Sequence, residues 1–229
     1  MKTIAIVGAG AGLGMSIAKK FGQNGFRVAL IARNEEKLNQ LVIELEQLGI
    51  EAASFQADIL NKEQIEMAFA AIKEKYGFID VLEYSPTPSF DTVAQLKGTP
   101  IADGHELMIR AMNKLNKKRF ITLATPALQS DDDKKNMSTI LPGVLAKVLL
   151  PNGYAEMKRM EGMIKESNLD WTVVRIINPN VKYTGQTYDF SFGDNSAKLS
   201  VSRENVAKFM YSAARDNQLI RKMPIIYNK

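Results

Sequence analysis

Four glycines at alternate positions, Gly8, Gly10, Gly12 and Gly14, constrain this chain more than any other feature. They follow a short β-prone run and precede apolar residues at the spacing of a helix. Glycine lets the backbone turn tightly and approach a ligand without a Cβ in the way. A helix that starts after such a turn presents free N–H groups and a partial positive charge. The stretch therefore predicts a diphosphate site of the dinucleotide-binding kind, with a plain tight turn as the alternative.

Buried-type strands and amphipathic helices alternate from residue 4 to residue 83. Further strands are expected at 120–124, 171–177 and 224–227. Further helices are expected at 102–116 and 153–167 and after Ser202. This alternation predicts a parallel sheet of about seven strands with helices on both faces, doubly wound because crossovers are right-handed. We expect one α/β domain over residues 1–229, with its ligand crevice at the carboxyl ends of the strands.

Composition excludes several classes of site. The chain has no cysteine and one histidine, His105, which excludes thiolate metal sites and disfavours a Ser-His-Asp triad or a multi-histidine metal centre. No apolar run approaches the ~20 residues that span a bilayer, and the first apolar stretch is too short for a signal peptide. We therefore expect a cytoplasmic protein with no membrane partner and no metal. The net charge of +5 comes without a basic–aromatic stripe, which favours an anionic cofactor over nucleic acid.

The cofactor preference depends on Arg33. Dinucleotide folds often carry an acidic residue at the end of the second strand, where it binds the ribose 2′-OH. Here Ala32 and Arg33 stand in that place. An arginine can hold a 2′-phosphate by a charge-assisted hydrogen bond, so the sequence favours NADP(H) over NAD(H). The alternative is a surface arginine with no ligand.

Tyr154 and Lys158 form the second candidate constellation. At a spacing of four they share one face of a helix. A nearby ammonium lowers the pKa of a tyrosine hydroxyl, and such a tyrosine can protonate a carbonyl oxygen while hydride arrives from a nicotinamide. Thr125, at the end of the fifth strand, can supply a hydroxyl that orients the carbonyl, although a structural strand-end threonine is the alternative.

Two stretches between the fifth strand and Tyr154 carry weaker signals. Asp131, Asp132 and Asp133 are interpreted as a solvated turn and not a metal site, because consecutive side chains diverge and lysines follow them. The apolar segment 140–150 is either a mobile cover over the crevice or a short packed helix. Residues 181–199 show no clear period.

Four short motifs together resemble the short-chain dehydrogenase/reductase superfamily. They are Gly8-x-x-x-Gly12-x-Gly14, Ala32-Arg33-Asn34, Asp58-Ile59 and Tyr154-x-x-x-Lys158. The resemblance implies a Rossmann domain with an NADP(H) site and a Tyr-Lys active site assisted by Thr125. Expected at the cofactor are Gly8, Gly10, Ala11, Gly12, Leu13, Gly14, Arg33, Asn34, Asp58, Ile59, Ser85, Pro86, Asn178 and Pro179.

The resemblance changes character along the chain. Residues 1–88 resemble the catalytic branch of the superfamily, and residues 98–229 resemble its atypical, NmrA-like branch. The stretches that carry the second likeness are Lys118-Arg119-Phe120-Ile121, Leu169 to Arg175 and Val201 to Ala207. The two patterns meet between Tyr84 and Gly98. We hypothesise a hybrid chain, natural or engineered, without a domain boundary at this junction.

The chain also departs from the catalytic branch. Glu83-Tyr84-Ser85-Pro86 replaces the usual Asn-Asn-Ala-Gly, and Pro142 stands where the catalytic serine is usual, with Ser138 nearest. The helix asparagine of that branch is either Asn113 or Asn116.

The function we expect is that of an NADPH-dependent oxidoreductase acting on a small carbonyl, quinone or flavin-like molecule. The alternatives are a non-catalytic NADP(H)-binding sensor or regulator and a recombined scaffold without evolved activity. A homodimer is left open.

Overall fold

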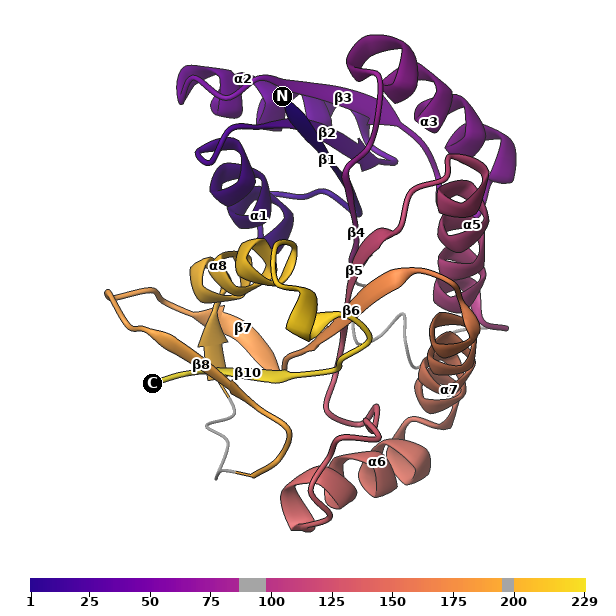
Figure 1. Ribbon diagram of the computed structural model, residues 1–229, viewed down its shortest axis with the longest axis vertical. Coiled ribbons are helices and arrows are strands. Elements are labelled where there is room, and N and C mark those ends of the chain that lie inside the picture. Colours follow the sequence, from indigo (N-terminus) through magenta and orange to yellow (C-terminus); the bar gives the residue numbers. More distant parts are fainter. Residues whose placement is uncertain (87–97, 195–199) are drawn as a thin grey trace.

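The computed structural model describes residues 1–86, 98–194 and 200–229 (Figure 1). The strands are β1 Lys2–Val7, β2 Phe26–Ala32, β3 Ala52–Gln56, β4 Val81–Tyr84, β5 Arg119–Ala124, β6 Asp170–Arg175, β7 Asn178–Val181, β8 Tyr188–Ser191, β9 Ser200–Ser202 and β10 Ile225–Asn228. The helices are α1 Leu13–Gly22, α2 Glu35–Gln47, α3 Lys62–Tyr76, α5 Pro100–Lys114, α6 Met137–Leu149, α7 Pro151–Glu166 and α8 Arg203–Ala213, with a short 3-10 turn at Asn217–Leu219.

Eight strands form one sheet in the order β3-β2-β1-β4-β5-β6-β10-β8. All neighbours from β3 to β10 are parallel, and β8 pairs antiparallel with β10 at the edge. A separate two-stranded sheet joins β7 and β9. The seven parallel strands confirm the predicted doubly wound α/β fold. The edge strand β8 is an addition, because it lies in a stretch whose sequence has no clear period.

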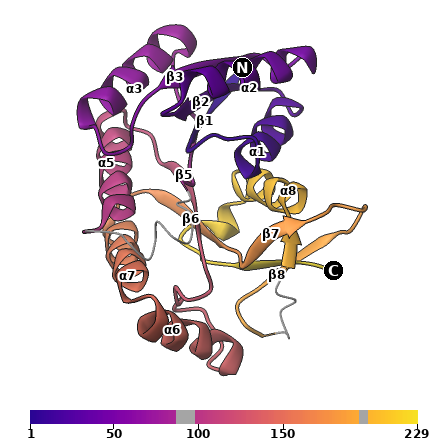
Figure 2. The same cartoon turned by 180° about the vertical axis from the view of Figure 1, so that it is seen from behind.

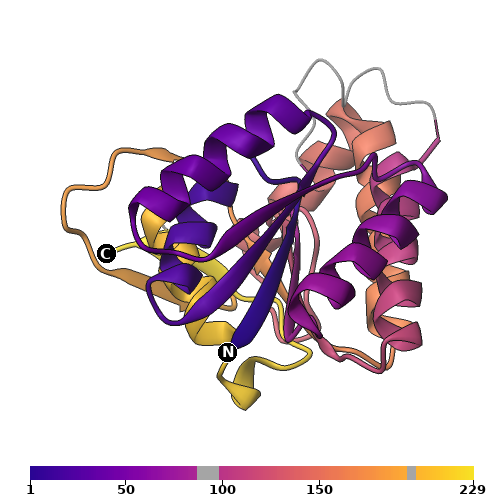
Figure 3. The same cartoon turned by 90° about the horizontal axis from the view of Figure 1, so that it is seen from above.

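Helices cover both faces of the large sheet (Figure 3). α1, α2 and α8 lie on one face, and α3, α5 and α7 lie on the other (Figure 1). Along β1, Ile4 and Ile6 pack into the first layer while Ala5 and Val7 pack into the second. Strands buried on both faces need apolar residues at successive positions, which explains their unbroken hydrophobic runs.

Polar side chains fix where several helices begin. Asn34, Asn61 and Ser202 each accept a hydrogen bond from a backbone N–H in the first turn of α2, α3 and α8. The start of α5 has no side-chain cap of its own. Instead, the carboxylate of Glu156 on α7 accepts two N–H groups from the first turn of α5, at 3.0 and 2.9 Å. This contact joins the two helices through a charge that suits the positive end of the α5 dipole.

The segment expected at 140–150 belongs to α6, which packs beside α7 (Figure 2). The segment is therefore helical, as the second of the two alternatives predicted. Its large apolar side chains are nevertheless exposed: Met137, Ile140, Leu141, Val144, Leu145, Val148 and Leu149. Within the described ranges no helix, α6 included, is long and apolar enough to cross a bilayer.

The end of the sixth strand differs from the prediction. β6 stops at Arg175, two residues early, and the Asn178-Pro179-Asn180 stretch expected to break it forms β7. Pro179 lacks an N–H group, but Asn178 and Asn180 on either side of it are the residues that pair with β9. Strand pairing across residues distant in sequence thus outweighs the local signal of a turn.

Candidate cofactor and active site

The carboxyl ends of the seven parallel strands lie at one edge of the sheet. β1 lies between β2 and β4, so the direction of strand order reverses beside β1, and β5 and β6 follow β4. A crevice opens at such a switch point in doubly wound sheets. The glycine loop, Ser85-Pro86 and Thr125 follow β1, β4 and β5, and therefore all lie at this edge.

Gly8 is the sterically critical glycine of the loop. Its φ of +90° is rare for other residues, and a Cβ there would lie 2.7 Å from the backbone nitrogen of Pro86. The N–H of Gly8 donates to the carbonyl of Ile31 at 2.9 Å. The structure therefore brings the predicted residues Gly8, Ser85 and Pro86 together in one backbone contact.

The other glycines line the start of α1. A Cβ on Gly14 would lie 3.1 Å from the Cα of Ala9, which shows how tightly the loop folds back on the helix. A Cβ on Gly10 would meet no described atom within 4 Å. α1 begins at Leu13, directly after Gly12, with no side-chain cap and no acidic residue in its first turn. Exposed Ala11 continues this open surface, whereas Leu13 packs against the core. The loop can thus offer backbone N–H groups to a diphosphate.

Arg33 and Asn34 follow β2 at the same edge. Arg33 is exposed, and its guanidinium forms no ion pair with a described residue. Asn34 is engaged by the fold, because its side chain accepts from the N–H of Lys37 at 2.8 Å. Of the two, Arg33 is the side chain with free donors for a phosphate.

Asp58 and Ile59 follow β3 and are half-buried. The carboxylate of Asp58 accepts from the N–H of Leu60 at 3.0 Å, and the Asp58 N–H donates to Gln64 at 2.8 Å. Both contacts shape the turn into α3. The pair follows β3, which is the neighbour of β2 in the sheet, and its expected contact with the adenine stays a prediction.

Glu83 on β4 is a buried carboxyl group for which no role was predicted. It is 0% exposed, and burial raises its pKa to about 8, with a hydrogen bond from Ser85 acting in the opposite direction. Glu83 pairs in register with Ile6 of β1 and Ile121 of β5. A neutral carboxyl group therefore lies inside the sheet, directly before the predicted residues Ser85 and Pro86.

Asn178 and Pro179 lie on β7, which leads from β6 toward β9. Directly after β9 comes a residue with no predicted role. Arg203, the first residue of α8, stacks against Gly12: a Cβ on Gly12 would lie 3.3 Å from the Cζ atom of Arg203. The signal that could have found it is an arginine directly after a capping serine, although that pattern alone gives no hint of the glycine loop.

Thr125, Tyr154 and Lys158 gather on neighbouring elements but do not form the expected triad. The Thr125 hydroxyl donates to the sulfur of Met157 on α7 at 3.3 Å. Tyr154 is half-buried, and its hydroxyl has no hydrogen-bond partner among the described residues. The ammonium of Lys158 binds the carboxylate of Glu161 at 2.5 Å. The helix thus brings Tyr154 and Lys158 to one side, while the ammonium is paired with a carboxylate.

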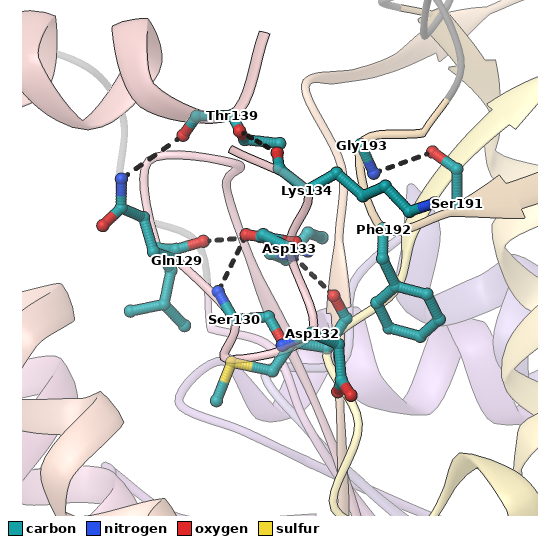
Figure 4. Close-up of polar contacts among 12 residues, drawn as sticks. Gln129, Ser130, Asp132, Asp133, Lys134, Thr139, Ser191, Phe192 and Gly193 are labelled. Atoms are coloured by element: carbon teal, nitrogen blue, oxygen red, sulfur yellow. Dashed lines mark hydrogen bonds and ion pairs between the residues drawn. The ribbon is translucent and has the colours of Figure 1, made fainter. Parts of the chain in front are cut away.

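Lys158 and Glu161 face a polar cavity of about 540 Å³ between α7 and the β5–α6 connection. Figure 4 shows the other wall, where Gln129 donates to the carbonyl of Thr139 and Asp133 accepts from the N–H of Ser130. The end of β8 adjoins this wall, because the N–H of Lys134 donates to the carbonyl of Phe192 at 2.9 Å. The cavity is large enough for a small molecule.

Asp133 is not part of a solvated turn, so that expectation was wrong for this residue. Its carboxylate forms a bidentate ion pair with Arg175 of β6, at 2.7 and 2.5 Å, and its side chain is 7% exposed. Arg175 is fully buried and also donates to the carbonyls of Leu128 and Met223. Asp131 and Asp132 do face solvent, where they pair with Lys165 and Lys222.

His105 is a core residue. It is 1% exposed, and burial lowers its pKa to about 4, so the ring is neutral near pH 7. Nδ1 donates to the carbonyl of Ile101 at 2.9 Å, and Nε2 lies 2.8 Å from the Thr122 hydroxyl. Across the described part of the chain, no group of three metal-ligating side chains is found.

A doubly wound parallel sheet with a glycine loop at its switch point defines a dinucleotide-binding α/β protein. The profile of the short chain dehydrogenase family matches residues 2–134, which is more than half of the chain. The protein belongs to this family. The match runs through the 84–98 stretch, and the hybrid hypothesis stays a prediction.

The relatives named below each match about a third of this chain. The chain is 40% identical over 77 residues to a Streptomyces coelicolor protein named "Putative ketoacyl reductase", covering 34% of this chain and 30% of that protein. It is 34% identical over 80 residues to the 3beta-hydroxysteroid dehydrogenase of Mediterraneibacter gnavus, covering 35% and 29%. The matches thus span about three tenths of these relatives' length.

Solved structures extend the likeness of fold to the whole chain. A short-chain dehydrogenase/reductase of Veillonella parvula in complex with NADP has a TM-score of 0.70 at 16% identity, covering 98% of this chain and 94% of that one. At this identity the likeness shows the fold alone.

Proposed function

We propose that this protein is an NADPH-dependent reductase of a small carbonyl, quinone or flavin-like substrate. The glycine loop carries the proposal: α1 begins uncapped, beside a glycine with open space before it, at the switch point of the sheet. The residues present fit a dinucleotide, because the loop has room for a diphosphate and backbone donors to hold it.

Arg33 supports a preference for NADPH. It is exposed directly after β2, and no carboxylate stands there to bind a 2′-OH. A guanidinium at this place would form charge-assisted hydrogen bonds with a 2′-phosphate. NADH lacks that phosphate and would gain nothing from Arg33.

Tyr154, Thr125 and Lys158 are proposed to act on the substrate. The chemistry that a nicotinamide would supply here, when bound, is a hydride for the substrate carbon. The Tyr154 hydroxyl gives its proton to the carbonyl oxygen, and the Thr125 hydroxyl orients that oxygen by a hydrogen bond. Lys158 would leave Glu161 to approach Tyr154 and the nicotinamide ribose.

A non-catalytic NADP(H)-binding sensor is the second candidate. Two contacts favour it, because they occupy side chains that catalysis would need: Lys158 binds Glu161, and the Thr125 hydroxyl donates to Met157. In that case the chain binds the same cofactor without turnover.

The first experiment separates the two cofactors. Titrations of NADPH and NADH are compared for the wild type, Arg33→Ala and the control Arg110→Ala, which removes an exposed arginine on α5. We expect Arg33→Ala to weaken NADPH about 10-fold or more and to leave NADH unchanged. Equal losses for both nucleotides would exclude the 2′-phosphate role.

The second experiment separates enzyme from sensor. NADPH oxidation is followed with a panel of carbonyls and quinones, comparing the wild type with Tyr154→Phe and with Tyr188→Phe on β8 as the control. If Tyr154 is the acid, its variant loses about 10²- to 10⁴-fold in turnover, with nucleotide binding retained. Binding without oxidation of NADPH by the wild type would favour the sensor.

A further inference from the structure

α8 and α1 pack side by side (Figures 1 and 2). The side chain of the first residue of α8 reaches the glycine loop. The guanidinium of Arg203 lies against Gly12, the residue directly before α1. A Cβ on Gly12 would lie 3.3 Å from Cζ and 3.4 Å from Nη1 of Arg203. We propose that Arg203 binds the diphosphate of the nucleotide beside Gly12. This assignment rests on the proposed function and adds a residue to its cofactor site.

The position of Arg203 is set by contacts on both sides. Ser202 pairs with Asn180 across the small sheet, and its side chain accepts from the N–H of Asn205 to start α8. The side chain of Asn180 then accepts from Nη2 of Arg203 at 2.7 Å. The guanidinium is therefore oriented before any ligand arrives, which lowers the entropy lost when it binds an anion.

The charge of Arg203 is not neutralised within the described structure. Its contact with Asn180 is to a neutral amide, and none of its nitrogens is within ion-pair distance of a described carboxylate. Arg203 is also half-buried, unlike a fully solvated surface arginine. A guanidinium in this state retains both charge and donors for phosphate oxygens.

The groove beside Arg203 is predominantly basic. A cavity of about 430 Å³ between α1 and α8 begins at Ala11 and Gly12 and is lined by Lys19, Lys20 and Lys208. The two carboxylates on it are Glu44, which binds Lys19 at 2.6 Å, and Glu204, beside Arg203 in sequence. This excess of cations attracts a dianionic diphosphate toward the start of α1.

The diphosphate is common to NADH, NADPH and ADP, whereas the 2′-phosphate is present only in NADPH. Arg203 and Arg33 are thus expected to give opposite patterns of ligand dependence. In Arg203→Gln, dissociation constants for NADPH, NADH and ADP should each rise about 10- to 100-fold. The affinity for adenosine 2′-monophosphate, which has no diphosphate, should change less than about 2-fold.

The matched control is Arg215→Gln, which removes a guanidinium near the other end of α8, where it contacts the Tyr211 hydroxyl. It should leave all four affinities unchanged. A second variant, Asn180→Ala, keeps Arg203 but removes the acceptor that orients it, so it should weaken the three diphosphate ligands together by a smaller factor. Thermal unfolding checks that each variant is folded.

Two failures can be told apart. If the wild type binds neither NADPH nor NADH, the proposed function falls and this assignment with it. If the wild type binds and Arg203→Gln leaves NADPH and ADP unchanged, the assignment of Arg203 is wrong and the proposed function stands. A loss confined to NADPH would also overturn it, because that pattern belongs to a 2′-phosphate contact.

Discussion

Two connections at the carboxyl edge of the sheet are held in place by different means. The β1–α1 loop is shaped by backbone against backbone, with Gly8 against Pro86 and Gly14 against Ala9. The β5–α6 connection is held by side chains, since Asp133 reaches the buried guanidinium of Arg175. A constraint on the backbone leaves glycines at fixed spacing in the sequence, whereas a buried ion pair joins residues 42 positions apart and leaves no local pattern.

The largest loss of unfolding free energy is expected from a substitution in the β5–α6 connection. Asp133→Ala leaves the charge of Arg175 buried without its carboxylate, which typically costs about 3–5 kcal/mol of unfolding free energy. Asp132→Ala is the matched control, because it breaks a half-exposed pair with Lys222 and should cost under about 1 kcal/mol. Chemical denaturation measures both. Equal losses would show that the ion pair does not hold this connection.

A smaller loss of unfolding free energy is expected from a substitution in the glycine loop. Gly8→Ala combines a strained φ with a Cβ pressed against Pro86, and we expect a loss of about 2–4 kcal/mol. Gly25→Ala is the control, because Gly25 has a φ of +81° but open space at the Cβ position. It should lose only the strain, about 1 kcal/mol. If both variants lose the same amount, contact with Pro86 does not fix the loop.

The third effect is a change of stability with pH, and it concerns Glu83, on the strand between the two connections. Its pKa is raised from the ordinary 4.5 to about 8, so above pH 4.5 the unfolded chain releases a proton that the folded chain keeps. Stability should therefore fall as pH rises from about 4.5 to 8, by roughly 1 kcal/mol per pH unit. Glu83→Gln should flatten this slope in denaturation curves taken between pH 5 and 8. An unchanged slope would mean that Glu83 ionises normally.

The fold could be predicted from the sequence because its signals are local. Alternating strands and helices give the doubly wound sheet, and the caps Asn61 and Ser202 lie where the sequence places them. β8 escaped prediction because an edge strand is defined by its pairing with β10, not by a pattern of its own.

In the candidate site, too, some features follow from the sequence and others depend on tertiary packing. The approach of Ser85 and Pro86 to Gly8 follows from strand order, which the sequence indicates. The partner of Lys158 does not follow from the Tyr-x-x-x-Lys spacing, because Glu161 competes for its ammonium from one turn further along the helix. Arg203 was missed for a related reason: its neighbour Gly12 is distant in sequence and is reached only through the packing of α8 on α1.

The buried ion pair between Asp133 and Arg175 has a consequence for any molecule that enters the cavity beside it. Asp133 is one of the residues that line this space, and it is anchored to a strand in the middle of the fold. A ligand would therefore meet a wall already in place and would not have to order a loop as it binds. Association should then be fast and proceed in a single kinetic phase, with little of the binding free energy spent on loss of chain entropy.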